Sequence, residues 1–243
     1  MKKVLSLVMV LAITLSLAAC GGNNSTTTNQ TTTPTETEAS TQDAAPLDFE
    51  SIIAEYKENK ISAEDNYFNK NYLLTGGVWE FNDDSVMILC LDSSYFATVK
   101  MPREDMKKFS KDDVITVCGK LTSFGDPNDS ILQLTLSDAH YVDNITELTG
   151  KVDNYHAYDY DLNTIYASIA VPYFKDGKVV ECFYDIEIPN CDKTVKQDAT
   201  VTINDIKLKK GDTVSFSGVM KRNPDAGTRI YTVMELKSIE SGN

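Results

Sequence analysis

The chain has 243 residues, of which 42% are hydrophobic and 24% charged, so it can form a packed core and is neither wholly disordered nor collagen-like. Its 36 acidic and 23 basic side chains give a formal net charge of -13, which opposes a general attraction to phosphate backbones. We therefore expect no nucleic-acid partner. Because the chain has only two histidines and one tryptophan, His-based catalysis and His-rich metal centres are disfavoured.

The N-terminal residues have the pattern of a secretory signal, with two lysines followed by an apolar run over 4–17. That run is shorter than the roughly 20 residues that a membrane-spanning helix needs. The sequence Leu17-Ala18-Ala19-Cys20 resembles the lipobox of bacterial lipoproteins. The resemblance implies that 1–19 is a cleaved signal peptide and that Cys20 carries acyl chains, such as palmitate, that hold the protein on the outer face of the cytoplasmic membrane. A cleaved signal peptide without lipid, or an uncleaved anchor, is the alternative.

Residues 20–46 have the composition of a flexible tether. They are rich in Thr and contain no aromatic residue, Lys or Arg. Such a segment cannot bury enough apolar surface to form a core, so we expect it to be disordered and to separate the folded part from the lipid surface.

The following residues, 47–143, predict a helix and then a small barrel. Asp48 is a suitable N-cap for a helix over 49–59, and a second helical start is expected at Ser62. A short helix is also expected within a series of strands. The expected segments after the leading helices are strands over 72–81, 85–91 and 95–101, a helix over 102–109, and strands over 114–124 and 131–142.

Three strands, a helix and two strands is the order of the OB-fold, a five-stranded Greek-key barrel. Residues 144–243 repeat the pattern, because Leu74-Thr75-Gly76 is echoed by Leu148-Thr149-Gly150 and the segment 111–119 by 210–218. We therefore predict an all-β protein with minor helix, built from tandem OB barrels with a boundary near Asn144. These paired motifs resemble the tRNA-anticodon-like OB family found in bacterial lipoproteins, a likeness that implies fold and not function.

The second repeat carries the candidate ligand-binding residues. OB-folds bind ligands on their second and third strands and in the loops after strands one and four. Tyrosines are concentrated early in this repeat, and the later of the two loops has an arginine at each end. The candidates are Tyr155, Tyr158, Tyr160, Arg222 and Arg229. Tyrosine and arginine together suit recognition of a protein or carbohydrate surface, whereas the alternative is that the tyrosines are core and strand residues.

Four cysteines follow Cys20, two in each repeat. Cys90 could pair with Cys118, and Cys182 with Cys191, in an extracytoplasmic compartment. Buried free thiols are the alternative for both pairs, because no C-x-x-C spacing suggests metal or redox chemistry.

Catalytic and metal-binding motifs are weak. His140 and His156 are the only imidazoles, and we interpret both as structural. The segment 159–163 begins like a calcium loop, but Thr164 stands where the pattern needs Gly. We therefore expect no catalytic residue, metal or cofactor, with a weak calcium site as the alternative.

These patterns together predict a lipid-anchored, extracytoplasmic bacterial protein that acts as a non-catalytic binding or interaction module. Two other readings stay open. One is a hydrolase that uses a carboxylate pair, and the other is a structural spacer.

Overall fold

The computed structural model describes residues 44–91, 93, 95–125, 133–175, 178–191 and 195–242, apart from the side chain of Phe174. The expected signal peptide, Cys20 and the tether as far as residue 43 lie outside the described residues. No helix in the described ranges has the length and hydropathy needed to cross a membrane.

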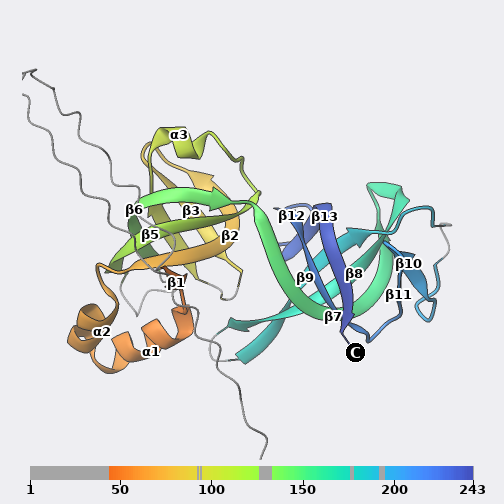
Figure 1. Ribbon diagram of the computed structural model, residues 1–243, viewed down its shortest axis with the longest axis horizontal. Helices are drawn as coiled ribbons and strands as arrows, with labels where there is room; N and C mark the ends of the chain where they lie inside the picture. The colour runs from red at the N-terminus through yellow and green to blue at the C-terminus, as the bar shows by residue number, and fades with distance from the viewer. Residues whose placement is uncertain are drawn as a thin grey trace, which may run out of the picture. The chain divides into compact units, whose positions relative to one another are not determined.

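Strands form most of the described chain (Figure 1). In chain order the elements are β1 Ala45–Pro46, α1 Phe49–Glu58, α2 Lys60–Tyr67, β2 Asn71–Phe81, β3 Ser85–Cys90, β4 Phe96–Lys100, α3 Arg103–Met106, β5 Val114–Phe124, β6 Gln133–Asp143, β7 Ile145–Tyr158, β8 Asp161–Lys175, β9 Lys178–Glu187, β10 Val201–Ile203, β11 Ile206–Leu208, β12 Thr213–Arg222 and β13 Ile230–Gly242.

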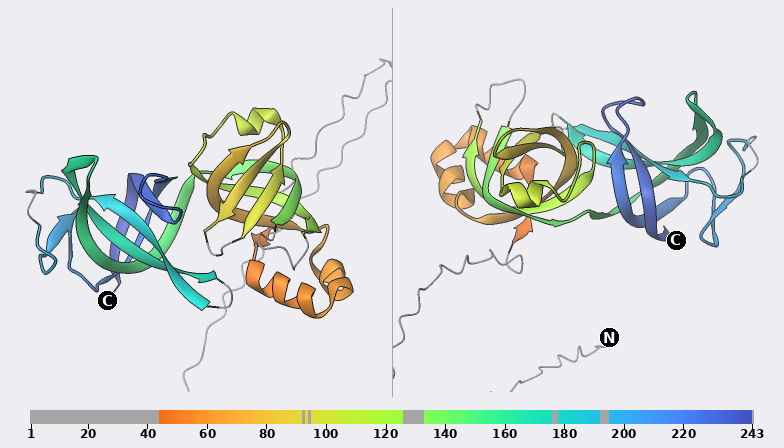
Figure 2. Two further views of the ribbon diagram at one scale, coloured as in Figure 1. Left: turned by 180° about the vertical axis from the view of Figure 1, so that it is seen from behind. Right: turned by 90° about the horizontal axis from the view of Figure 1, so that it is seen from above.

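The first barrel consists of β2 to β6. Its strands pair in the order β2-β3-β4-β6-β5, and β5 also pairs with β2, which closes the sheet. The parallel pairing of β4 with β6 and the helix α3 between β4 and β5 give the OB topology. Helices α1 and α2 lie beside this barrel (Figure 2). The α1 residues Phe49, Ile52, Ile53 and Tyr56 belong to the same buried cluster as the barrel core.

The second barrel has the same topology and confirms the predicted tandem fold. Strands β7, β8, β9, β12 and β13 form a closed barrel in the order β12-β13-β9-β8-β7. In place of the helix of the first barrel, the β10–β11 hairpin lies between β9 and β12 in the chain. Asn144 is the single residue between β6 and β7, so one barrel follows the other directly.

Glycines at equivalent positions permit close approach of neighbouring strands in both barrels. A Cβ on Gly76 would lie 2.5 Å from the Leu89 carbonyl oxygen, and one on Gly150 would lie 2.5 Å from that of Ala170. Both glycines are on the first strand of their barrel and face the second strand. The close approach of the strands therefore explains the glycine in the repeated Leu-Thr-Gly sequence.

Local expectations at the start of the folded part are largely confirmed. Asp48 caps α1, since its Oδ1 accepts a hydrogen bond from the Ser51 backbone N–H at 3.1 Å. Helix α2 begins earlier than expected because Asn59, and not Ser62, is its N-cap. Ala45 and Pro46, within the expected tether, form β1 and pair with β2. These two residues of the expected tether therefore belong to the described sheet.

Candidate binding surface

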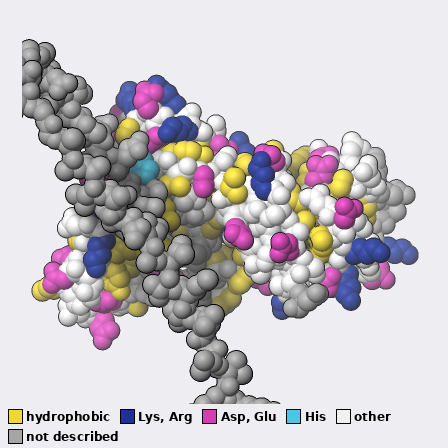
Figure 3. Space-filling model, viewed as in Figure 1, with side chains coloured by type: hydrophobic (Ala, Val, Ile, Leu, Met, Phe, Trp, Pro, Cys, Tyr) yellow, Lys and Arg dark blue, Asp and Glu magenta, His cyan; other side chains and the backbone are white. Residues whose placement is uncertain are grey.

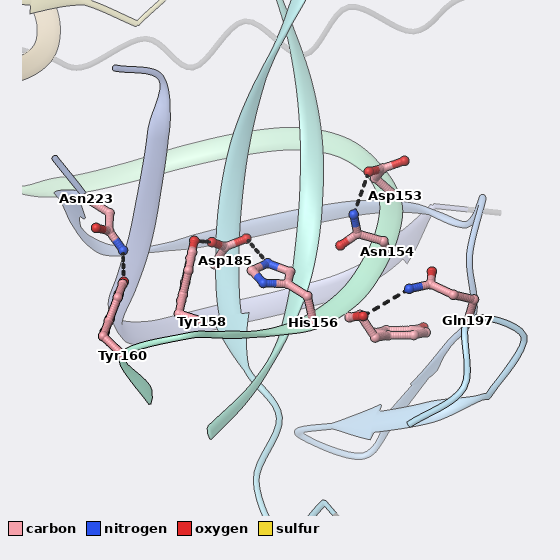
Figure 4. Close-up of polar contacts among 9 residues, drawn as sticks. Asp153, Asn154, His156, Tyr158, Tyr160, Asp185, Gln197 and Asn223 are labelled. Carbon is pink, nitrogen blue, oxygen red and sulfur yellow. Dashed lines mark hydrogen bonds and ion pairs between the residues drawn. The ribbon is translucent and has the colours of Figure 1, made fainter. Parts of the chain in front are cut away.

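Two loops of the second barrel meet at the site where OB-folds bind ligands. The first is the turn between β7 and β8, which carries Tyr160, and the second is the β12–β13 loop over 223–229. The Asn223 side-chain amide donates a hydrogen bond to the Tyr160 hydroxyl oxygen at 2.6 Å (Figure 4). The sequence prediction that these loops approach one another is confirmed by this contact.

Two tyrosines are stacked at this junction. The ring centroids of Tyr158 and Tyr160 are 5.0 Å apart, and their planes differ by 8°. Tyr160 is 61% exposed, although one face of its ring lies against Tyr158. Tyr166 packs against Tyr158 from β8, with ring centroids 5.5 Å apart. We define the tyrosine surface as Tyr158, Tyr160 and Tyr166.

A buried carboxylate supports the stack from β9. Asp185 is 0% exposed, and its carboxylate accepts hydrogen bonds from the Tyr158 hydroxyl and from the His156 ring at 3.2 Å (Figure 4). Burial, and then the hydrogen bond to Asp185, raises the pKa of Tyr158 well above its ordinary value. Tyr158 is therefore a neutral hydrogen-bond donor at physiological pH, and its ring is held in a fixed position.

Tyr155 does not belong to this surface. It is 3% exposed, and its hydroxyl donates a hydrogen bond to the Leu208 carbonyl oxygen on β11 at 3.0 Å. The alternation of inward and outward side chains along β7 directs Tyr155 into the core and leaves His156 partly exposed. The expected role of Tyr155 as a ligand-binding residue is therefore wrong.

Arg222 also faces away from the tyrosine surface. Its guanidinium lies 4.4 Å from the centroid of the Trp79 ring on β2 and forms an ion pair with Asp112. The Arg222 backbone N–H donates to the Asp112 carbonyl oxygen at 2.7 Å. At 7% exposure, Arg222 joins the two barrels and is not available to a ligand.

Arg229, at the other end of the loop, also contacts the first barrel. It donates hydrogen bonds to the carbonyl oxygens of Cys90, at 2.6 Å, and Ser93 in the first barrel. Its guanidinium also lies 4.5 Å from the Tyr173 ring centroid. Leu91 and Val114 of the first barrel are part of the buried cluster of the second. The two arginines were thus predicted in the correct loop, but they stabilise the junction between the barrels.

The described cysteines form neither of the two disulfides that the sequence left open. Cys118 and Cys182 are buried free thiols. Cys90 belongs to the core cluster of the first barrel, whereas Cys118, although buried, does not. Cys182 donates to the Arg229 carbonyl oxygen at 3.1 Å, and Cys191 is partly exposed.

The described residues include no group of three or more His, Cys, Asp and Glu side chains arranged to hold a metal ion. In the calcium-like segment, Asp161 accepts hydrogen bonds from the Asn163 N–H at 3.3 Å and from the Tyr166 hydroxyl at 3.4 Å. His140 is on β6 of the first barrel, whereas the tyrosine surface is on the second barrel. His156 is the imidazole that contributes to it.

Sequence reasoning missed Asn223 and Asp185. A signal for Asp185 existed, because it is the one charged residue in the otherwise apolar run Cys182-Phe183-Tyr184-Asp185-Ile186. A buried carboxylate needs hydrogen-bond partners, so this pattern could have indicated a polar site inside β9. Asn223 gave no comparable signal.

The comparisons with known proteins give no family. No protein-family model and no curated protein matches the chain. Among solved structures, it is similar to the Ifi202 HINa domain in complex with 20-bp double-stranded DNA, with 12% identity over 72% of this chain and 97% of that one and a TM-score of 0.24. It is also similar to a chain from a structure described as "Structural mimicry for functional antagonism", with 13% identity, 68% and 89% coverage and a TM-score of 0.21.

The first of these similar structures is a complex with double-stranded DNA, so the expectation that nucleic acid is no partner is withdrawn. That expectation used the net charge of the whole chain. The local field at a binding surface depends on nearby side chains, and the two repeats differ in charge. By count, residues 47–143 hold 18 acidic and 9 basic side chains, whereas 144–243 hold 15 and 12. Net charge alone was an insufficient reason to exclude this class of partner.

Proposed function

We propose that this protein is a non-catalytic binding module, lipid-anchored through Cys20 on the outer face of the bacterial cytoplasmic membrane, and that it binds its ligand at the tyrosine surface. The anchor is supported by the lipobox-like sequence at 17–20 and by the Thr-rich segment that follows it. The ligand we propose is a protein or a carbohydrate, because exposed tyrosines recognise both.

The observation that carries the proposal is the fixed and exposed position of Tyr160. Tyr160 is 61% exposed, yet its ring is stacked on Tyr158 and its hydroxyl is held by Asn223 from the opposite loop. Large exposed aromatic side chains that are already ordered lose little conformational entropy on binding. Such preorganisation is expected of a recognition surface.

Two other functions remain as test outcomes. A carboxylate-pair hydrolase needs two acidic groups flanking the scissile bond. Asp185, the carboxylate next to the tyrosine surface, is fully buried and is hydrogen-bonded to Tyr158 and His156. In this position it can hold the tyrosine rings in place, but it cannot reach the scissile bond of a ligand. A structural spacer would not depend on the tyrosine surface at all.

Binding can be tested with a soluble chain of residues 21–243, which retains every described residue. The chain and its Tyr160→Ala variant would be applied to arrays of peptides, of oligosaccharides and of DNA. We expect at least one class of probe to bind the wild-type chain and to be lost from the variant. Equal signals from both proteins on all arrays would favour the spacer, and turnover of a glycan probe would favour the hydrolase.

The anchor has a separate test in intact-mass measurement of the protein from its native membrane fraction. We expect the mass of a chain that begins at Cys20 and carries acyl chains. Cleavage without added lipid would show a secreted module and contradict the proposed location.

A further inference from the structure

We propose that the tyrosine surface, together with the carboxylates of Asp159 and Asp161, recognises Lys or Arg side chains in a basic segment of a partner protein. This inference rests on the proposed function, because it names the ligand class of the same surface. It is argued from the open ring face of Tyr160, from the charges around it and from the flanking apolar side chain.

Tyr160 presents one face of its aromatic ring to solvent. Tyr158 covers one face of Tyr160, and the exposure of 61% leaves the other face available to a ligand. The face of an aromatic ring is electronegative and attracts ammonium and guanidinium groups. The described residues already contain guanidinium contacts of this kind, where Arg222 lies over Trp79 and Arg229 over Tyr173.

The residues on either side of Tyr160 in the chain are acidic. Tyr160 lies between Asp159, which is exposed, and Asp161, which is partly exposed. Glu187 is exposed at the end of β9, where it pairs with Tyr166 of the tyrosine surface. Arg222 at the end of β12 and Arg229 in the β12–β13 loop are engaged with the first barrel. The surface therefore combines a ring face with negative charge, which favours a cation over a neutral ligand.

The arrangement of the rings favours a basic side chain over a compact small cation. Sites for quaternary ammonium ions enclose the cation within several rings. Here the rings of Tyr158 and Tyr160 are parallel to within 8°, so they offer one open face and no enclosure. Leu162, two residues further along, is 62% exposed. An apolar neighbour of this kind suits the aliphatic stem of Lys or Arg, whose charged end reaches the carboxylates.

The general attraction of a cation to this acidic protein must be distinguished from specific binding at the tyrosine surface. Acidic side chains are scattered over the face drawn in Figure 3 and are not gathered in one patch. Any polycation will therefore be attracted diffusely. Asp83, an exposed residue in the β2–β3 turn of the first barrel, provides a control that removes the same charge elsewhere.

The test measures fluorescence anisotropy of a labelled peptide of alternating Arg and Gly with the soluble chain 21–243 at physiological ionic strength. The matched probe has citrulline in place of every Arg, which keeps the shape and removes the charge. We expect the Arg peptide to bind about tenfold more tightly than the citrulline peptide. The citrulline peptide has no positive charge and so cannot make the cation-π contact. Tyr160→Leu should weaken Arg-peptide binding about tenfold, and Asp159→Asn about threefold. Asp83→Asn should change it by less than about twofold.

Each other outcome has a definite meaning. If Asp83→Asn weakens binding as much as Asp159→Asn does, and Tyr160→Leu changes nothing, the attraction is diffuse and the inference is wrong. If the citrulline peptide, chitotetraose or a 20-bp DNA duplex binds in a manner that depends on Tyr160, the surface is a binding site for another ligand class, so the proposed function survives and the inference fails. If no probe depends on Tyr160, both fail. Circular dichroism of each variant confirms that the barrels remain folded.

Discussion

The Asn223 amide donates to the Tyr160 hydroxyl oxygen across 2.6 Å, although the two residues are 63 positions apart in the chain. This bond joins the β7–β8 turn to the β12–β13 loop. The Tyr160 ring is therefore restrained on two sides, by Tyr158 through stacking and by Asn223 through its hydroxyl. The order of the surface depends on contacts within a single barrel.

Removing this hydrogen bond should loosen the turn without unfolding the barrel. Asn223→Ala removes this bond and the one that the Asn223 side-chain oxygen accepts from the Ala226 N–H at 3.3 Å. We expect a loss of about 1 to 2 kcal/mol in the free energy of unfolding, because the first bond is exposed to solvent and the second is long. Hydrogen exchange at residues 159–163 should become faster, and binding at Tyr160 should weaken. Asn82→Ala, in the turn of the other barrel, is the control. Unchanged exchange at 159–163 would show that Asn223 does not order the turn.

Arg229 should contribute strongly to the stability of the junction between the barrels. Arg229→Ala removes hydrogen bonds to the carbonyl oxygens of Cys90 and Ser93 and the contact with Tyr173. We expect a loss of roughly 2 to 4 kcal/mol, measured by urea unfolding. Lys107→Ala, which removes only an exposed pair with Glu104, should cost less than about 1 kcal/mol. Equal effects of the two substitutions would contradict the role of Arg229.

The protein should lose stability at high pH, in part because of Cys182. Burial raises the pKa of the Cys182 thiol to about 11, from an ordinary value of 9.0. Because the folded-state pKa lies above the unfolded one, the stabilisation by this thiol is complete below about pH 9 and is lost as the pH rises through 11. Burial also raises the pKa of Tyr158 and Tyr231, which act in the same direction.

Unfolding measured from about pH 8 to about pH 11 checks this dependence. In Cys182→Ala, the loss of stability over that interval should be smaller than in the wild type, by on the order of 2 kcal/mol. An identical loss in both proteins would show that burial does not raise the pKa of the Cys182 thiol.

Two adjacent glycines should respond differently to the same substitution. A Cβ on Gly76 would approach the Leu89 carbonyl oxygen to 2.5 Å, whereas one on Gly77 would be in ordinary contact with Tyr231 at 3.4 Å. We therefore expect Gly76→Ala to lower the free energy of unfolding by roughly 2 to 4 kcal/mol, and Gly77→Ala by less than about 1 kcal/mol. Thermal unfolding compares the two variants directly, and equal shifts would contradict the close approach of β2 and β3.

Local sequence patterns predicted the fold well where the physical cause is local. The N-cap at Asp48 located the start of α1, and the alternation of apolar residues gave β5 its observed bounds, Val114–Phe124. The β10–β11 hairpin was not predicted. Each of its strands has three residues, too few for a clear period, and it is held by burial of Val201, Ile203 and Leu208 in the core of the second barrel.

The candidate site was predicted only as far as its loops. Tyr158 and Tyr160 could be selected from composition and position, because a hairpin turn of an OB barrel exposes its side chains. The direction of Arg222 and Arg229 depends on the first barrel, which supplies Asp112 and the Cys90 carbonyl oxygen. No pattern within the second repeat contains that information.

A nuclear magnetic resonance titration of the soluble chain 21–243 with the Arg-Gly peptide tests the central claim most directly. We expect the chemical-shift changes to be concentrated at Tyr158 to Tyr166 and at Asn223, and to disappear in Tyr160→Leu. Shifts confined to the first barrel, or spread evenly over both, would contradict the assignment of binding to the tyrosine surface.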